Sequence, residues 1–201
     1  MTTLLIYDGA IADDAPARRT GGVPLVPDGF SWPLCRTCKG AMQFLAHLPG
    51  EEQVVSVFMC QNDPGLCEEW SPADGGNRAY LFPHGGLAPA AVPPEGETSL
   101  GAVSALRTES VEEQDYFDAV QAWVAAGHED ESPVLGALGG EPYWIQDDET
   151  PNCPSCSHRM DFAALLEEGR DHNTAANFGG GGCGYAFTCA PCSEAAFLWQ
   201  C

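Results

Sequence analysis

The sequence predicts an α+β protein of mixed α/β content, in which a sheet-dominated module occurs twice. The first observation is that ten identical residues recur 118 positions apart, beginning with Gly21 and Gly139. The second is a set of short runs rich in branched and aromatic residues, separated by Gly and Pro, which is typical of strands. The third is one stretch of helical periodicity between the two copies.

The repeat needs no gap between its first and last matched residues. Its pairs are Gly21/Gly139, Gly22/Gly140, Pro24/Pro142, Pro33/Pro151, Cys35/Cys153, Cys38/Cys156, Met42/Met160, Phe44/Phe162, Ala46/Ala164 and Leu48/Leu166. Further along, Phe58-Met59-Cys60 matches Phe187-Thr188-Cys189 at an offset of 129. The second copy therefore carries about eleven extra residues, which we place in the Gly/Asn-rich run around Asn173–Gly182.

We expect a single domain over residues 1–201. It comprises a first repeat at 18–92, an acidic helical connection at 93–132 and a second repeat at 133–201. A repeat of about 70 residues would bury too little apolar surface to be stable alone. The two repeats should therefore form one continuous structure, related by a pseudo-twofold axis, and unfold together.

Four runs have strand-forming composition. They are Leu4–Tyr7, Val54–Cys60, Ala79–Phe82 and Tyr185–Cys189. The run Met42–Leu48, after the first cysteine pair, is compatible with either a strand or a helix. The matching run Met160–Leu166 leads into Glu167 and Glu168, and this composition favours a helix.

One helix is predicted inside the acidic connection. Ser110 to Glu113 has the pattern of a capping box, in which a hydroxyl and a carboxylate each bind a free backbone N–H. The apolar residues that share one side at helical spacing are Val111, Phe117, Val120, Trp123 and Val124. Gly127 supplies the stop signal. We expect the Phe and Trp to pack in the core.

Eight of the ten cysteines form two sets of potential metal ligands. The first set is Cys35, Cys38, Cys60 and Cys67, and the second is Cys153, Cys156, Cys189 and Cys192. A tetrahedral zinc site takes four soft ligands at about 2.3 Å, and a Cys-x-x-Cys turn supplies two of them. The second set has the Cys-x-x-Cys pairs of a zinc ribbon. The sequence therefore predicts two structural Zn²⁺ ions in zinc-ribbon-like sites.

Alternatives to this ligand assignment remain open. Redox-active dithiols or disulfides would use the same motifs. Cys183 and Cys201 have no counterparts in the first repeat, and each is expected to be a buried small apolar side chain. Cys183 stands six residues before Cys189 and could instead replace one ligand of the second set. His47 occupies the position of Leu165 in the second copy, which favours packing or hydrogen bonding over metal binding.

The charge of the chain excludes several classes of partner. Its formal net charge is −21, and Pro93–Thr150 contains fourteen carboxylates and one basic residue, Arg107. Nucleic acids and anionic lipids need a basic surface, so neither is an expected partner, whereas a basic protein is. The start of the sequence lacks a basic region followed by a long apolar stretch, and no segment is apolar enough to span a bilayer. We expect a soluble cytoplasmic protein.

Several motifs resemble those of a known family. They are Gly-Gly-x-Pro, Trp-Pro-x-Cys-x-x-Cys followed by Met-x-Phe-Leu-Ala, Gly-Tyr-x-Phe-x-Cys, and the final Phe-Leu-Trp-Gln. Together they resemble the YwqG-like family of bacterial proteins of unknown function and, more distantly, the eukaryotic programmed cell death protein 2. The resemblance implies an internally duplicated mixed α/β fold. For the eukaryotic relatives it implies a role as dedicated chaperones of a ribosomal protein.

The sequence favours binding over catalysis. Four thiolates fill a tetrahedral zinc site and leave no position to activate water. The chain has no Gly-x-Ser-x-Gly, no Gly-x4-Gly-Lys and no His-Glu-x-x-His motif. We therefore expect a zinc-stabilised protein-binding module that acts as a chaperone or inhibitor of a basic polypeptide. The alternative is a thiol-dependent oxidoreductase, or an enzyme whose site has no recognisable motif.

Overall fold

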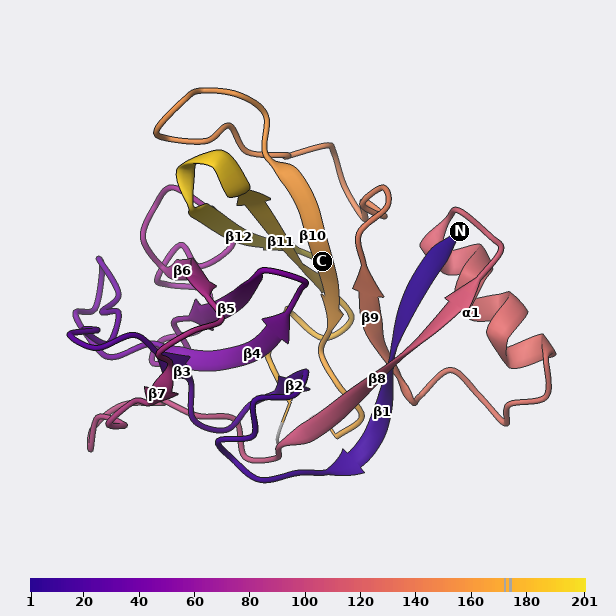
Figure 1. Cartoon of the computed structure of the whole chain (residues 1–201), viewed down its shortest axis with the longest axis horizontal. Helices are drawn as coiled ribbons and strands as arrows, with labels where there is room; N and C mark the ends of the chain where they lie inside the picture. The colour runs from indigo at the N-terminus through magenta and orange to yellow at the C-terminus, as the bar shows by residue number, and fades with distance from the viewer. Residues whose placement is uncertain (172, 174) are drawn as a thin grey trace.

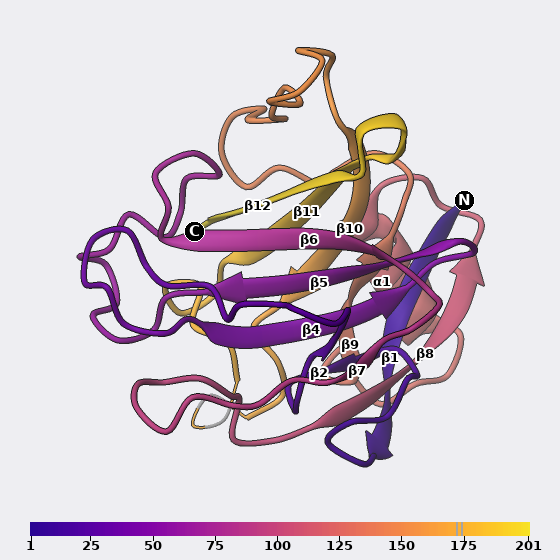
Figure 2. The ribbon, with the colours of Figure 1, turned by 60° about the vertical axis from the view of Figure 1, so that its left-hand side comes forward.

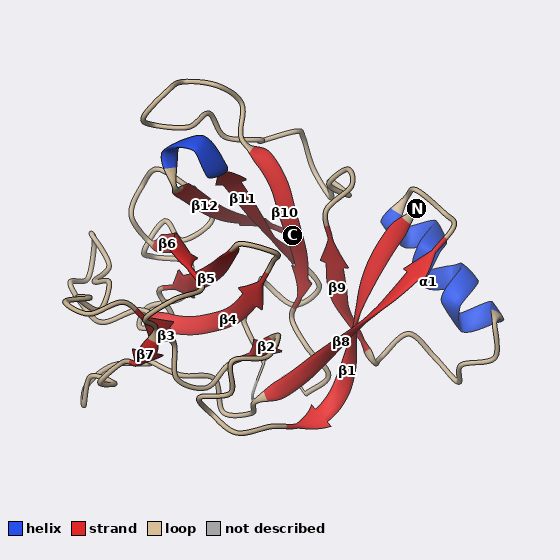
Figure 3. Cartoon of the chain, viewed as in Figure 1, coloured by secondary structure: helices blue, strands red, loops and turns tan. Residues whose placement is uncertain are grey.

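Strands make up most of the regular structure. A computed structural model of the chain describes residues 1–171, 173 and 175–201 (Figure 1). Its elements, in chain order, are β1 (Thr2–Ala10), β2 (Arg19–Thr20), β3 (Leu25–Val26), β4 (Gln43–Pro49), β5 (Gln53–Met59), β6 (Asn77–Pro83), β7 (Ala88–Pro89), β8 (Ser104–Val111), α1 (Tyr116–Ala125), β9 (Val134–Leu138), β10 (Asp161–Glu167), β11 (Cys183–Cys189), the 3₁₀ turn η1 (Ala190–Cys192) and β12 (Glu194–Gln200). The expected dominance of sheets is confirmed, and the helical share is small (Figure 3).

Ten of these strands form one sheet in the order β12-β11-β10-β9-β1-β8-β2-β4-β5-β6. Each neighbouring pair is antiparallel. The sheet curls until its two edge strands, β6 and β12, pack side by side (Figure 2). Strands β3 and β7 pair separately. None of the described helices is long and apolar enough to cross a membrane.

The same backbone pairings occur on both sides of the central strands β1 and β8. Arg19 pairs with His47 in the first half, and Ala137 pairs with Leu165 in the second, 118 residues later. Strands β4 and β10 each have a register irregularity one residue before their matched alanine, Ala46 or Ala164. Outward from the centre, β2, β4, β5 and β6 therefore follow the same pattern as β9, β10, β11 and β12.

The concave side of the curled sheet holds one apolar core to which both halves contribute. The first half supplies Leu45, Leu48, Val55, Val57, Ala79 and Leu81, and the second supplies Leu135, Ala164, Leu166, Ala186 and Phe197. Leu5 and Leu106, on the two central strands, lie between these groups. Strand β8 belongs to the segment 93–132 that was expected to be a connection, and it forms the middle of the sheet.

The strand predictions agree with the structure except in one segment. The runs Leu4–Tyr7, Val54–Cys60, Ala79–Phe82 and Tyr185–Cys189 fall almost entirely in β1, β5, β6 and β11. The ambiguous run Met42–Leu48 becomes strand β4. The helix favoured for Met160–Leu166 is wrong, because this segment forms β10, which is hydrogen-bonded to β9 and β11. Pairing on both edges outweighs the local preference of alanine and leucine for a helix.

The predicted helix exists but begins later than expected. Ser110 lies in β8 and pairs with Thr3, so the predicted capping box is wrong. Asp115 caps the helix instead, because its carboxylate accepts a hydrogen bond of 3.2 Å from the Asp118 N–H. Trp123 is buried as predicted, whereas Phe117 is 54% exposed and not in the core. The predicted stop is close to the true end of α1.

Candidate metal centres

The first cysteine pair lies in a tight turn between Pro33 and Met42. The Cys35 N–H donates to the Gly40 carbonyl (2.9 Å), and the Lys39 N–H donates to the Cys35 carbonyl (3.0 Å). Lys39 has a φ of 66°, in the left-handed region, which lets the chain turn back within a few residues. These hydrogen bonds direct the Cys35 and Cys38 side chains to the same side of the turn.

The remaining two cysteines of this first cluster come from the end of β5 and from the loop that follows. The Cys60 N–H donates to the Gly76 carbonyl (2.7 Å), which anchors the strand end. The Glu69 carboxylate accepts a 3.2 Å hydrogen bond from the Cys67 N–H and so holds the loop in place. The Sγ atoms of Cys35, Cys38, Cys60 and Cys67 all lie within 4.8 Å of one another.

The second cluster begins with the same turn. The Cys153 N–H donates to the His158 carbonyl (2.8 Å), and the Ser157 N–H donates to the Cys153 carbonyl (2.8 Å). Ser157 has a φ of 62° and stands 118 residues after Lys39. The second pair of cysteines, Cys189 and Cys192, spans the 3₁₀ turn η1. The Sγ atoms of Cys153, Cys156, Cys189 and Cys192 also lie within 4.8 Å of one another.

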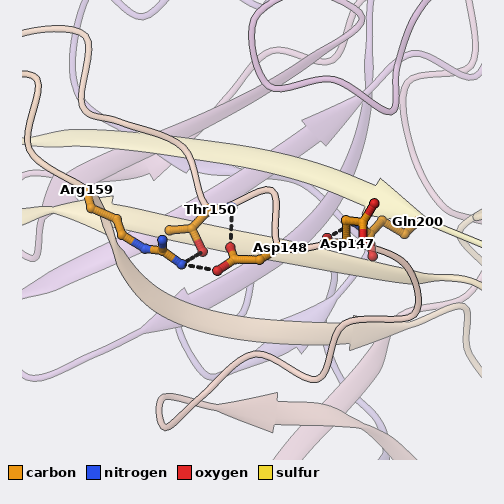
Figure 4. Close-up of polar contacts among 5 residues, drawn as sticks. All are labelled: Asp147, Asp148, Thr150, Arg159 and Gln200. Atoms are coloured by element: carbon orange, nitrogen blue, oxygen red, sulfur yellow. Dashed lines mark hydrogen bonds and ion pairs between the residues drawn. The ribbon is translucent and has the colours of Figure 1, made fainter.

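Polar contacts fasten the loop that leads into the second cluster (Figure 4). Arg159 follows the Cys153–Cys156 turn, and its guanidinium donates to the Asp148 carboxylate and to the Thr150 hydroxyl (2.9 Å). Gln200, at the end of β12, donates to the Asp147 carbonyl (2.8 Å). The loop is thereby tied both to the cysteine turn and to the edge of the sheet.

The sulfur spacing fits four thiolates around one ion. In a tetrahedron with Zn–S bonds of about 2.3 Å, the sulfur atoms are about 3.8 Å apart. The Cys38 and Cys60 Sγ atoms are 3.6 Å apart, and the Cys156 and Cys189 Sγ atoms are 3.8 Å apart. A disulfide would need an S–S distance of about 2 Å, and all ten cysteines are free. Each cluster could therefore hold a metal ion.

The surroundings already favour the thiolate at one cysteine of each cluster. Burial alone would raise the pKa of Cys153, but backbone N–H groups of the Cys-x-x-Cys turn outweigh it and lower that pKa to about 7. At Cys38 burial is likewise outweighed, by the Gly40 N–H and the other thiols, and the pKa falls below its usual value. The neighbouring thiol of Cys156 contributes most to raising the pKa of Cys192, to about 12. A bound cation would favour deprotonation of the remaining thiols.

Two cysteines lie outside the clusters. Cys183, at the start of β11, is buried, and burial together with the charge of Glu167 raises its pKa well above the usual value. The four sulfur atoms of the second cluster come together without it. Cys201 is exposed, so the burial expected for it is wrong, because it follows the last strand instead of lying within the sheet. His47 is 1% exposed and belongs to β4, where it pairs with Arg19 of β2 and Ser56 of β5. This position agrees with the packing role expected for it.

Sequence reasoning missed one residue at the first cluster. The Asn62 side-chain amide donates to the Sγ atoms of Cys60 (3.4 Å) and Cys38 (3.7 Å) and to the Ala41 carbonyl (3.0 Å). Hydrogen bonds to a ligating sulfur orient it and stabilise its negative charge. The only signal in the sequence is the position of this amide two residues after Cys60, and the second cluster has Pro191 at the corresponding place.

Comparison with known proteins gives one informative match. The chain is 30% identical over 122 residues to the "Uncharacterized protein YpfL" of Salmonella typhimurium strain LT2. The match covers 55% of this chain and 28% of that relative, whose name states no activity. No family model and no solved structure matches the chain. The resemblance to the YwqG-like family and to programmed cell death protein 2 therefore stays a prediction.

Proposed function

We propose that the protein is a zinc-stabilised binding module for a basic polypeptide, acting as its chaperone or inhibitor. The observation that carries the zinc assignment is the pair of four-sulfur clusters, with Sγ atoms 3.6 Å apart (Cys38 and Cys60) and 3.8 Å apart (Cys156 and Cys189). Soft thiolate ligands in a tetrahedral array select zinc over magnesium and calcium. Because four thiolates fill the coordination sphere, the proposed ions are structural.

We also propose that the fold arose by internal duplication, with a pseudo-twofold axis between β1 and β8. The matching pairings of Arg19 with His47 and of Ala137 with Leu165 support this, as does the palindromic strand order. The central strands β1 and β8 fit the same symmetry. A twofold axis through the Ile6–Arg107 pair would exchange the two strands and leave this residue pair in place. Under this proposal, each repeat carries one zinc ion on its outer loops.

The charge of the protein supports a basic partner. A net charge of −21 on a chain of this size attracts cationic polypeptides and accelerates their association. The distant resemblance to programmed cell death protein 2 points to the same role, since a ribosomal protein is a basic client. The acidic surface would shield such a client from nucleic acid until it is delivered.

The zinc assignment is tested by metal analysis of protein purified without added metal. We expect two Zn²⁺ ions per chain by inductively coupled plasma mass spectrometry. Cys60→Ser and Cys189→Ser should each lose one ion, whereas the control Cys201→Ser should retain both. Metal-free protein with thiols that exchange readily with disulfides would contradict the proposal and favour a thiol oxidoreductase.

The basic partner is tested by the salt dependence of association. A partner captured by the native protein should bind more slowly as salt rises, because screening acts over roughly 8 to 10 Å at physiological ionic strength. Neutralising Glu129, Asp130 and Glu131 should slow association more than neutralising the exposed Glu51, Glu52 and Asp63. A rate that depends on neither salt nor charge would leave the acidity without a role in binding.

A further inference from the structure

A groove beside α1 is lined by residues that belong to neither cysteine cluster. Its cavity of about 540 Å³ lies between the helix, the end of β10 and the segment around Tyr143. Its walls include Tyr116, Phe117 and Tyr143, and the Tyr116 and Tyr143 ring centroids are 6.1 Å apart. The size and the aromatic lining are typical of ligand sites. Figure 1 shows α1 standing at one end of the molecule, beside β1 and β8.

Three carboxylates, those of Glu131, Glu167 and Glu168, line this groove. Glu167 accepts a 2.9 Å hydrogen bond from the Tyr116 hydroxyl, and Glu168 accepts backbone N–H groups of the loop before β11. Among the described residues, salt bridges join only Arg107 to Glu109 and Arg159 to Asp148, so none of the three is in an ion pair. Burial raises the pKa of Glu167, and a bound cation would oppose that rise. The groove therefore has an excess of negative charge.

The cation in the lining, Arg170, can offset only one of the three negative charges. Arg170 places its guanidinium over the Tyr7 ring, 4.7 Å from the centroid, and so packs towards a neighbouring cavity. In the described part of the chain, only the cysteine clusters bring ligand atoms close enough together for a metal ion. The three carboxylates do not form such a cluster. Carboxylates beside aromatic walls suit an organic cation on an apolar stem.

We infer that this groove is the docking site for a lysine or arginine side chain of the polypeptide partner. The inference deepens the proposed function and rests on it. The charged head would be held by Glu131 and Glu167, and its methylene stem would lie along Phe117 and Tyr116. Phe117 is 54% exposed, so a partner would also cover apolar surface that is open to water. The corresponding position of the first half holds Pro49, so the carboxylate of Glu167 has no counterpart there.

The test is isothermal titration of the zinc-loaded protein with a blocked peptide of alternating lysine and glycine. Glu131→Gln combined with Glu167→Gln should weaken binding about tenfold or more, because charge-assisted hydrogen bonds are lost. The charge-matched control, Glu51→Gln with Glu52→Gln, should change it less than about twofold. Phe117→Ala alters no charge and should weaken binding about threefold by removing a wall. Its exposed position makes misfolding an inadequate explanation of that loss.

The outcomes separate this inference from the proposed function. Equal losses in the two double variants, with Phe117→Ala unaffected, would overturn the groove and leave a partner attracted only by net charge. Binding of free cadaverine as tight as that of the peptide would overturn a polypeptide occupant. A wild-type protein that binds no peptide would overturn the basic partner itself.

Discussion

Each cysteine cluster contains the same kind of Cys-x-x-Cys turn, but the two clusters differ in how far their remaining cysteines are buried. In the first, Cys35, Cys60 and Cys67 are buried, and Asn62 donates to two of the sulfur atoms. In the second, Cys192 is partly exposed, whereas the matched residues Cys38 and Cys156 are partly exposed in both clusters alike. The local hydrogen bonds of the Cys-x-x-Cys turn therefore determine the first two ligands. The segment that carries the other two cysteines determines how far the cluster is exposed to solvent.

The two halves also differ in the side chains and elements that cover their outer faces. The first half is covered by packed aromatic rings, those of Phe30, Phe44, Phe58, Tyr80 and Phe82. The second half has packed rings too, those of Trp144, Phe162, Tyr185 and Phe187, but α1 also lies beside it and lines a groove with Tyr116. Two halves with the same strand order can thus differ in what covers them, and the proposed docking groove lies only in the second half.

Metal removal should have the largest effect and should act on the second cluster first. Binding free energy at a structural zinc site is also folding free energy, on the order of 10 kcal/mol. With increasing chelator we expect one ion to leave before the other, with loss of structure measured by circular dichroism. Cys189→Ser should abolish the early step, and Cys60→Ser the late one. Simultaneous release, or an unchanged thermal midpoint after complete removal, would contradict this.

Substitution of Gly136 should cause the next largest loss. Gly136 has a φ of 136°, and a Cβ there would come within 2.0 Å of the Leu165 carbonyl oxygen. The corresponding position of the first half holds Arg18, so this close approach belongs to the second half alone. We expect Gly136→Ala to lower the free energy of unfolding by about 2 to 4 kcal/mol in urea titration.

Gly139→Ala is the matched control for this substitution. Gly139 also has a positive φ, 57°, but no atom lies within 4 Å of a Cβ built there. Its loss should be only about 1 kcal/mol, the cost of a left-handed backbone for a non-glycine residue. Equal losses in the two variants would show that backbone conformation, and not the close approach to β10, limits stability.

The third effect is a pH dependence that only the first half should show. Burial, followed by the charge of Arg19, lowers the pKa of His47 from 6.5 to about 4. Between these values the unfolded chain binds a proton that the folded protein does not. Stability is therefore complete above about pH 6.5 and should fall by up to about 3 kcal/mol as the pH decreases to 4.

His47→Leu introduces the residue of the second half and should flatten this dependence. The measurement is the free energy of unfolding from pH 7 to pH 4, compared with wild type. His84→Gln, at an exposed histidine that makes the smallest contribution to the lowered pKa of His47, is the control and should change the slope only slightly. A slope that persists in His47→Leu would assign the acid sensitivity to other groups.

Arg159→Gln should have the smallest effect on stability, because exposed ion pairs contribute little. It removes the contacts with Asp148 and Thr150 that fasten the loop before the second cluster. We expect faster metal release from that cluster to a colorimetric chelator, with a nearly unchanged thermal midpoint. Arg107→Gln breaks the other exposed pair, away from both clusters, and should not alter release. Equal rates in both variants would contradict this role of the loop.

Local patterns predicted a large part of the molecule. Each set of four cysteines was grouped from spacing alone, and the structure places the same four together. This works because a Cys-x-x-Cys turn is closed by hydrogen bonds within a few residues. The strands around Val57 and Tyr185 were predicted correctly for a similar reason, since branched and aromatic residues favour an extended chain.

By itself, then, the sequence determined the repeat, the cysteine sets, most of the strands and the charge. Only the tertiary structure decided that Asp161–Glu167 is a strand, that Ser110 lies in the sheet, and that β8 joins β1 at the centre. These features depend on hydrogen bonds between residues far apart in the chain, such as Thr3 with Ser110. Such pairing can outweigh local helix preference and capping patterns, and it cannot be predicted from a local sequence pattern.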